Sequence, residues 1–285
     1  MKLLKKIVVL SRMVKIEHSI FALPFAYIGL FLAAHGRPGW RPLLVLTLAM
    51  VAVRSFAMGF NRLADLPYDR ENPRTKDRPL VTGELTTTET RLFLAATGLI
   101  FIAACWALNT ACLVLSVPAL ALCAFYSYTK RFTILCHFFL GAVLGLAPVA
   151  GWLAFDPTLT MSAALFFLGV TFWVAGFDIL YACQDLDFDL DMALHSIPAK
   201  LGIETALPLS SFCHVNASIF FLLGGLTAGL GWIYILVWTG ISIVLALEHR
   251  LISANDMSRV NMAFFTLNGF IALALFAGAL ADVFL

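Results

Sequence analysis

Long apolar stretches recur along the whole chain, and each is close to the length that a helix needs to cross a bilayer. About 20 consecutive apolar residues make such a span. Short polar segments separate the stretches. The pattern predicts an all-α polytopic membrane protein, a single domain over residues 1–285, with nine spans at 16–35, 42–60, 91–109, 111–128, 134–154, 160–182, 208–228, 231–247 and 259–283.

The composition agrees with this pattern and narrows the alternatives. The chain is 61% hydrophobic and 13% charged, whereas a soluble domain is about 45–50% apolar and about 25% charged. The six cysteines are scattered without C-x-x-C spacing, so neither a disulfide framework nor a zinc site is indicated. The opening "MKLLKKIVVL" is too short in its apolar part for a signal peptide, and we interpret it as a basic start to the first span.

The basic residues predict an orientation in the membrane. Sixteen of the nineteen Lys and Arg residues lie on the side that holds the N-terminus, Arg37 and Arg41 lie on the other side, and Arg54 lies within a span. Because cytoplasmic loops carry an excess of Lys and Arg, we expect the N-terminus to be cytoplasmic.

Acidic residues are concentrated on the same side, although they contribute little to topology. Most of them lie in two segments, 61–90 and 178–207, which we expect to be loops after the second and the sixth span. This matching placement predicts two four-helix repeats followed by a ninth helix.

Each of these segments contains carboxylates spaced four residues apart, which share one face of a helix. Two such faces across a cavity would hold a diphosphate through Mg²⁺, because hard oxygen ligands suit Mg²⁺ and substrate phosphates complete its shell. A solvated acidic loop is the alternative for one motif, but two matched motifs favour the metal site. Pro67 places the first pair across a helix end. The motifs are Asn61-x-x-x-Asp65-x-x-x-Asp69 and Tyr181-x-x-x-Asp185-x-x-x-Asp189.

Basic side chains near the motifs are candidates for binding anions. Arg54 lies seven residues before Asn61, so both share a helix face, and a charge within a span usually faces a polar cavity. A structural ion pair with Asp178 or Glu17 is the alternative, and Asp178 is also a candidate site residue. Lys130 and Arg131 form a tight cytoplasmic connection, and "NPRTKDRPL" adds Arg78, whereas topology alone accounts for Arg74 and Lys76.

The ordered motifs resemble one family over nearly the whole chain. The first motif followed by "NPRTKDRPLVTGELT", then "YSYTKRFT", then the second motif followed by "HSIPAKLG", resembles the UbiA-type intramembrane aromatic prenyltransferases. The opening "KIEHSIFALPFAYIG" is similar to the branch of 4-hydroxybenzoate polyprenyltransferases.

The resemblance implies nine helices around a central cavity and Mg²⁺-dependent transfer of a polyprenyl group from its diphosphate to an aromatic acid. We expect the protein to lie in the lipid bilayer of the bacterial cytoplasmic (inner) membrane, and nothing in the sequence suggests a nucleic acid or an obligate protein as partner. The resemblance also implies roles for the motif residues. Asn61, Asp65, Asp69, Asp185 and Asp189 would hold Mg²⁺ and diphosphate, Lys130, Arg131 and Arg78 would aid substrate binding, Arg54 would face the aromatic carboxylate, and Tyr181 would line the pocket.

The sequence leaves several alternatives open. Many relatives carry lysine where this chain has His195, which puts the acceptor in doubt. Asp185 or Asp189 could be the base that removes the ring proton. The acceptor could belong to ubiquinone synthesis or to the futalosine route to menaquinone. A secondary transporter is the rival class, although its charges usually lie at the midplane.

Overall fold

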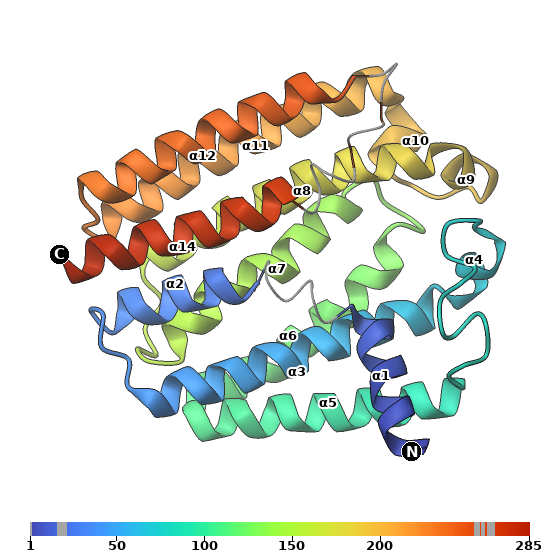
Figure 1. Cartoon of the computed structure of the whole chain (residues 1–285), viewed down its shortest axis with the longest axis horizontal. Coiled ribbons are helices and arrows are strands. Elements are labelled where there is room, and N and C mark those ends of the chain that lie inside the picture. Colours follow the sequence, from blue (N-terminus) through green and yellow to red (C-terminus); the bar gives the residue numbers. More distant parts are fainter. Residues whose placement is uncertain (1, 16–21, 254–256, 258–259, 261–265) are drawn as a thin grey trace.

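Helices form almost all of the structure. The computed structural model describes residues 2–15, 22–253, 257, 260 and 266–285, with side chains from residue 6 onward. The long helices run side by side in an elongated bundle (Figure 1), which confirms the predicted all-α fold. The helices are α1 (Lys2–Val14), α2 (Leu23–Ala33), α3 (Trp40–Ala64), α4 (Leu66–Glu71), α5 (Thr87–Leu108), α6 (Thr110–Thr129), α7 (Cys136–Leu153), α8 (Met161–Ala182), η2 (Cys183–Asp185), α9 (Leu186–Asp191), α10 (Ile197–Leu201), α11 (Ile203–Thr227), α12 (Trp232–Leu251) and α14 (Asn268–Phe284).

The described residues contain seven helices that are long and apolar enough to cross a membrane, and two shorter apolar helices, α2 and α14. These nine helices match the nine expected spans in order. Parts of the first and last expected spans, residues 16–21, 258–259 and 261–265, lie outside the described residues. The number of spans therefore stays a prediction, whereas the polytopic membrane fold is confirmed.

The joins between neighbouring helices follow from local chemistry. Asn109 separates α5 from α6, because its Oδ1 accepts the backbone N–H of Cys112 at 2.9 Å. This N-cap satisfies one of the donors that a helix start leaves unpaired. The Asn109 Nδ2 also donates to the Leu153 carbonyl at 2.7 Å, so the turn is fastened to the end of α7.

The core lies where α2, α8 and α11 meet. The Phe25 ring lies 5.2 Å from the Trp173 ring and 5.7 Å from the Phe221 ring, measured between centroids, and all three side chains are fully buried. Large apolar side chains such as Leu99 and Val114 are instead exposed on the outside of α5 and α6. An apolar outer surface of this kind is expected of a protein whose solvent is lipid.

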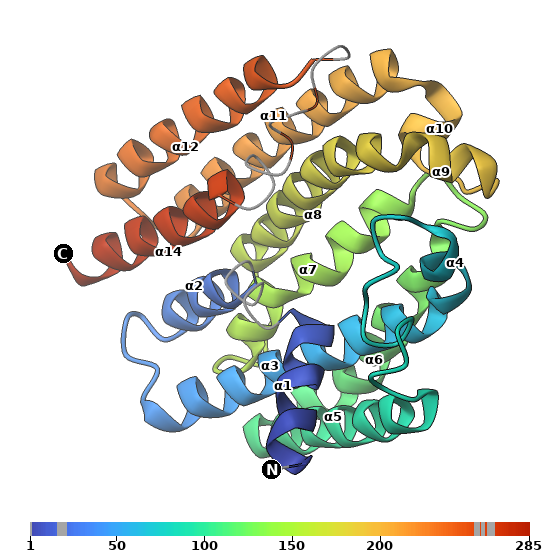
Figure 2. The same ribbon diagram turned by 45° about the vertical axis from the view of Figure 1, so that its right-hand side comes forward.

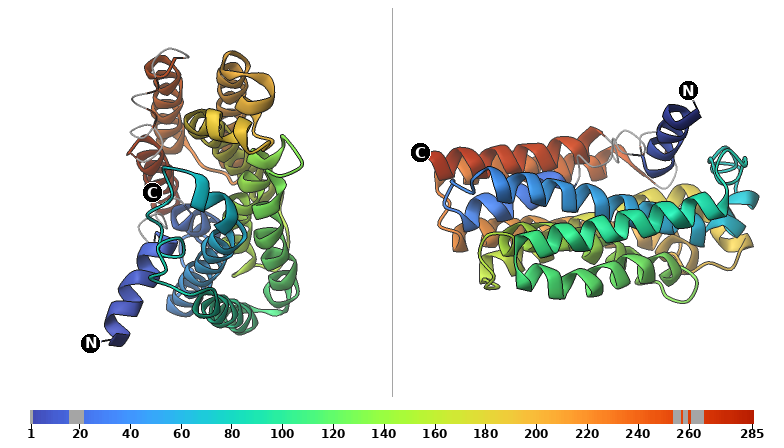
Figure 3. Two further views of the ribbon diagram at one scale, coloured as in Figure 1. Left: turned by 90° about the vertical axis from the view of Figure 1, so that its right-hand side faces the viewer. Right: turned by 90° about the horizontal axis from the view of Figure 1, so that it is seen from below.

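The N-terminal helix differs from the sequence expectation. Residues 2–14 form a helix of their own, α1, which lies across the direction of the bundle (Figures 1 and 3) and does not simply begin the first span. Val9 and Met13 are buried against Leu80 and Leu85 of the segment after α4. Tertiary packing on that segment, which periodicity in α1 cannot reveal, therefore sets its direction.

One end of the bundle collects the short helices. The segment with α4 and the segment with α9 and α10 face each other there (Figure 2), and Figure 3 (left) views this end head-on. Both segments were expected to be loops, but the motifs themselves lie on helix ends and short helices. The backbone N–H of Asp69 donates to the carbonyl of Asp65 at 2.8 Å, so helical spacing continues across the break before Pro67.

Candidate active site

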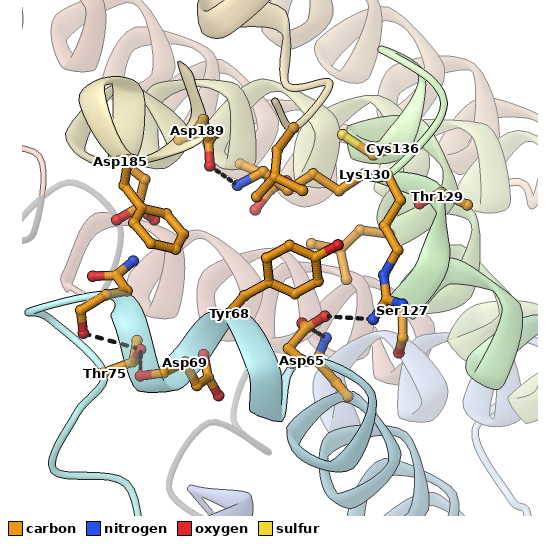
Figure 4. A pocket seen from close by; sticks show the side chains of 18 of the residues that line it. Asp65, Tyr68, Asp69, Thr75, Ser127, Thr129, Lys130, Cys136, Asp185 and Asp189 are labelled. Atoms are coloured by element: carbon orange, nitrogen blue, oxygen red, sulfur yellow. Dashed lines mark hydrogen bonds and ion pairs between the residues drawn. The ribbon is translucent and has the colours of Figure 1, made fainter. Parts of the chain in front are cut away.

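The two aspartate motifs line one cavity of about 230 Å³ at this end of the bundle. Asp65 and Asp69 approach it from the end of α3 and from α4, and Asp185 and Asp189 approach it from η2 and α9 on the opposite side (Figure 4). Asn61, Arg78, Lys130, Arg131 and Tyr181 line the same cavity. The structure thus places together all but one of the site residues expected from the sequence; Arg54 lies elsewhere.

Each motif carboxylate lies against one basic side chain. The Asp69 oxygens accept from Arg78 Nη1 at 2.6 Å, and Lys130 Nζ lies 2.7 Å from Asp189 Oδ1. Ser196 Oγ donates to the other oxygen of Asp189 at 2.6 Å, which helps to hold this fully buried carboxylate. The four pairs are Asp65–Arg131, Asp69–Arg78, Asp185–Arg74 and Asp189–Lys130.

Arg74 is a site residue that the sequence did not single out. Its guanidinium binds both oxygens of Asp185, with Nε at 2.9 Å and Nη2 at 2.6 Å, and its Nη1 donates to the Tyr181 hydroxyl at 3.2 Å. Arg74 therefore connects the segment of the first motif to the second motif. Lys76, two residues away, is exposed and does not line the cavity. Nothing in a single sequence separates these two basic residues.

Arg131 is held by three kinds of contact. Its Nη2 donates to the Ala64 carbonyl at 2.6 Å and lies 3.6 Å from Asp65 Oδ1. Its guanidinium carbon also lies 5.1 Å from the centre of the Tyr68 ring and 4.7 Å from that of Tyr128, within the range of cation–π attraction. These contacts fix a cation beside the first motif.

The environment of the cavity shifts the pKa values of two side chains that line it. Burial raises the pKa of the Asp65 carboxyl to about 6, and the neighbouring charge of Asp69 adds to this effect, while Arg131 and Arg62 oppose it. Burial alone would lower the pKa of the Lys130 ammonium, but the charge of Asp189 outweighs it and raises that pKa. The site thus holds ionised pairs in a poorly solvated place, where interactions with a further charge are strong.

Arg54 lies deeper in the bundle than the motifs. It lines a second, apolar cavity of about 140 Å³, and Tyr126 and Leu140 line both this cavity and the first. A third apolar cavity of about 220 Å³ shares Met50, Phe101 and other residues with the second. The three cavities therefore form a series that begins among charges and continues among apolar side chains.

Asp178 and Glu17 were the two ion-pair partners that the sequence suggested for Arg54. Asp178 lines the first cavity, where its Oδ2 lies 2.7 Å from His137 Nδ1, and Glu17 lies outside the described residues. His195 does not line the cavity. Its backbone N–H donates to the Lys130 carbonyl at 2.7 Å, so it helps to position the turn that carries Lys130.

The donor set fits Mg²⁺ under one condition. Within the described part of the chain, no three acidic, His or Cys side chains converge closely enough to hold a metal by themselves. Carboxylate oxygens are nevertheless the ligands that Mg²⁺ prefers, and Mg²⁺ is commonly bound by one or two carboxylates together with substrate phosphates. The site therefore fits Mg²⁺ that arrives with a phosphate ligand rather than a permanently bound ion.

Comparisons with known proteins show which chains this one is similar to. The profile of the UbiA prenyltransferase family matches residues 22–274. The chain is 30% identical over 288 residues to a protein of Shewanella sp. (strain W3-18-1) named 4-hydroxybenzoate octaprenyltransferase, with 99% of each chain covered. The apo structure of a UbiA homologue from Aeropyrum pernix K1 is similar with a TM-score of 0.84 and 36% identity, covering 94% of this chain and 98% of that one.

A third relative is similar in fold alone. It is a UbiA homologue from Archaeoglobus fulgidus whose structure was solved with GPP and Mg²⁺ bound. Its TM-score is 0.75 at 20% identity, and the match covers 97% of this chain and all of that one.

Proposed function

The chain belongs to the UbiA prenyltransferase family, and on that premise we propose that it transfers a polyprenyl group from polyprenyl diphosphate to an aromatic acid in an Mg²⁺-dependent reaction. The acceptor that we favour is 4-hydroxybenzoate, the acid in the name of the Shewanella relative. The observation that carries the proposal is the first cavity, here called the charged cavity, where the four motif carboxylates and their four basic partners meet beside a series of apolar cavities.

The charged cavity suits the diphosphate end of the donor. Asp65, Asp69, Asp185 and Asp189, with Asn61, would hold Mg²⁺, which supplies electrostatic stabilisation to a leaving diphosphate. The basic partners of the carboxylates, Arg74, Arg78, Lys130 and Arg131, would bind the diphosphate oxygens. These donors are already in place before the charge develops, which is the condition for strong transition-state stabilisation.

The apolar cavities suit the remaining parts of the substrates. The second and third cavities would take the prenyl chain, whose burial among side chains such as Met50 and Phe101 is favourable. Arg54 would bind the carboxylate of the aromatic acid. Because Tyr126 and Leu140 border both the charged cavity and the cavity of Arg54, the aromatic ring would lie between them, close to the first carbon of the prenyl chain.

The reaction that follows is an aromatic substitution. The bond between the prenyl carbon and the diphosphate oxygen breaks, the electron-rich ring carbon bonds to the prenyl carbon, and the ring then loses a proton. The cavity within the bundle keeps water away from the reactive carbon. The rings of Tyr68, Tyr126 and Tyr181 line this cavity and offer aromatic faces to a cation.

We further propose the bacterial cytoplasmic (inner) membrane as the location, with the N-terminus and the charged cavity on the cytoplasmic side. The excess of Lys and Arg on that side and the bacterial relatives support this orientation. Ubiquinone synthesis is the favoured pathway, and an acceptor of the futalosine route is the alternative. A secondary transporter is disfavoured, because the motif carboxylates gather at one end of the bundle.

The test is a prenylation assay with purified protein in detergent. We expect geranyl diphosphate and 4-hydroxybenzoate to give prenylated acid with Mg²⁺ and none with EDTA, as read by mass spectrometry. Diphosphate release without that product would point to another aromatic acceptor. Intact diphosphate with every aromatic acid tried would contradict the proposal.

Variants of the two motifs test whether both are needed. Asp65→Ala and Asp185→Ala should each abolish transfer, because each removes a ligand from one side of the cavity, while the protein still inserts and purifies. Asp187→Asn is the matched control, since Asp187 is exposed and lies between the two carboxylates of the second motif. Activity that survives both alanine variants would rule out the two-sided diphosphate site.

A further inference from the structure

Asp178 is a carboxylate of the charged cavity that belongs to neither motif. It lies on α8, a membrane-spanning helix, seven residues before Asp185. Asp178 is therefore about two helical turns further than Asp185 from the end of the bundle that holds the motifs. Its side chain keeps 24% of its surface accessible and lines the cavity. A carboxylate within a span is costly and usually has a function.

His137 of α7 holds Asp178 in one orientation. The His137 side chain is almost fully buried, and its Nδ1 lies 2.7 Å from Asp178 Oδ2. On the other side of the ring, the backbone N–H of Ile197 donates to His137 Nε2 at 3.1 Å. Because a backbone N–H can only donate, Nε2 is the unprotonated nitrogen, and Nδ1 carries the hydrogen that it donates to Asp178.

This partner distinguishes Asp178 from the motif carboxylates. The four motif carboxylates pair with Arg or Lys. Both oxygens of Asp185 accept from Arg74, and Asp189 accepts from Ser196 and forms an ion pair with Lys130. Asp178 is bound by a neutral imidazole, which orients it without cancelling its charge. A carboxylate in that state is able to accept a proton.

The position of the pair also fits proton removal. His137 and Leu140 lie one turn apart on α7, and Leu140 borders both the charged cavity and the cavity that contains Arg54. An aromatic acid held by Arg54 would place its ring at this boundary. Asp178 is therefore on the acceptor side of the cavity, whereas the motif carboxylates surround the diphosphate side.

We propose that Asp178 is the general base that removes the ring proton and that His137 is its positioning residue; the proposal rests on the prenyl transfer proposed above. As the ring carbon bonds to the prenyl carbon, the carbon–oxygen bond breaks and its electron pair leaves with the diphosphate. The substituted ring carbon then loses its proton to the Asp178 carboxylate. The electrons of that carbon–hydrogen bond restore the aromatic ring, and Asp178 later returns the proton to water.

The experiment compares Asp178→Asn with the wild type on 4-hydroxybenzoate and on its 3,5-dideuterated form. Asn keeps the shape and the hydrogen bond but is not a base. We expect kcat to fall by roughly 10²–10⁴-fold, the range for one general base. A primary isotope effect larger than that of the wild type should appear, because proton removal becomes the slow step.

Two further readouts separate the possible failures. Asp178→Asn should still release diphosphate and give prenyl alcohol, which shows a folded protein with a working donor site, and Asp187→Asn should behave as the wild type. A wild-type kcat and isotope effect in Asp178→Asn would overturn the proposal and leave the departing diphosphate as the base. If the wild type itself forms no prenylated acid, the proposed function fails instead.

His137 is tested through its effect on Asp178. His137→Phe should lower kcat and raise the isotope effect with little change in either KM. His137→Asn restores a donor near the place of Nδ1, and we expect it to recover part of kcat. Equal kcat values and equal isotope effects for His137→Phe and the wild type would rule out a positioning role.

Discussion

Among single residues, Arg54 makes the sharpest distinction between a substrate contact and a structural charge. If it binds the carboxylate of the aromatic acid, Arg54→Ala should raise KM for the acid by about 10- to 100-fold. A hydrogen bond to a charged group is worth about 1.5–3 kcal/mol. KM for the prenyl diphosphate should change less, because its diphosphate group binds in the charged cavity, which Arg54 does not line.

Steady-state kinetics with each substrate varied in turn measures this effect. Arg37→Ala is the control, since Arg37 is an exposed arginine in the connection between α2 and α3. An unchanged KM for the acid in Arg54→Ala would assign Arg54 a structural role.

Asp65 gives a prediction about pH. Its pKa is raised from 3.8 to about 6 in the folded protein, so folding favours its protonated form. The stability that this provides is complete below pH 4 and is lost as the pH rises through 6. In EDTA, we expect the thermal unfolding temperature to fall between pH 4 and 7, with a total loss of at most about 3 kcal/mol, since one pKa unit corresponds to about 1.4 kcal/mol.

Asp65→Asn should flatten that dependence, because the amide does not titrate, and differential scanning fluorimetry in detergent measures both curves. Identical pH dependence in the wild type and in Asp65→Asn would show that another group is responsible.

Among single residues, the sequence predicted the site residues that recur at a repeated spacing. It did not predict those whose role depends on contacts with distant parts of the chain. The motif aspartates were expected together because four-residue spacing occurs twice, after two spans in matching places. Arg74 resembled its basic neighbours in the sequence, and only its bond to Asp185 sets it apart. The contact between His137 and Asp178 joins two helices across 41 positions, which no local pattern encodes.

Between elements, α2 packs closely against α7. A Cβ atom added to Gly151 would lie 1.8 Å from the carbonyl oxygen of Ala26, and one added to Gly29 would lie 1.9 Å from that of Pro148. The two backbones therefore touch, as small residues allow in membrane helices. This contact keeps α2 in the core, where Phe25 meets Trp173.

Gly151→Ala should therefore destabilise the protein, by at least the roughly 1–3 kcal/mol that overpacking costs. A lower thermal unfolding temperature in detergent would show this. Gly240→Ala on α12 is the matched control, because an added Cβ there meets nothing within 4 Å. Equal stability of the two variants would mean that α2 and α7 separate without cost.

The positions of the helices along the chain were more predictable than the packing of one helix against another. The joins at Asn109 and near residues 229–231 were placed correctly, because apolar runs end there and polar or glycine residues follow. The connecting segments that carry the motifs contain the short helices α4 and α9, whose bounds were not predicted because helices this brief show no periodic pattern. α1 was joined to the first span for a related reason: its partners, Leu80 and Leu85, lie far along the chain.

For the whole molecule, the series of three cavities predicts a control of prenyl chain length. Ala119 of α6 borders both apolar cavities. Ala119→Trp should fill the passage between them, so that transfer from a long polyprenyl diphosphate falls by at least tenfold relative to geranyl diphosphate. Competition between the two donors, read by mass spectrometry, measures the ratio.

Ala121→Trp is the control, because Ala121 lies exposed on the same helix. An unchanged ratio of long to short products in Ala119→Trp would show that the prenyl chain takes another path.

The four ion pairs of the charged cavity also bear on how a reaction cycle ends. The carboxylates compete with diphosphate for the same four cations. The carboxylates are tethered, which gives them a high effective concentration, whereas the diphosphate becomes a separate ion once it is cut from the prenyl chain. We therefore expect the re-forming pairs to act as a built-in competitor that speeds product release and prepares the enzyme for its next turnover.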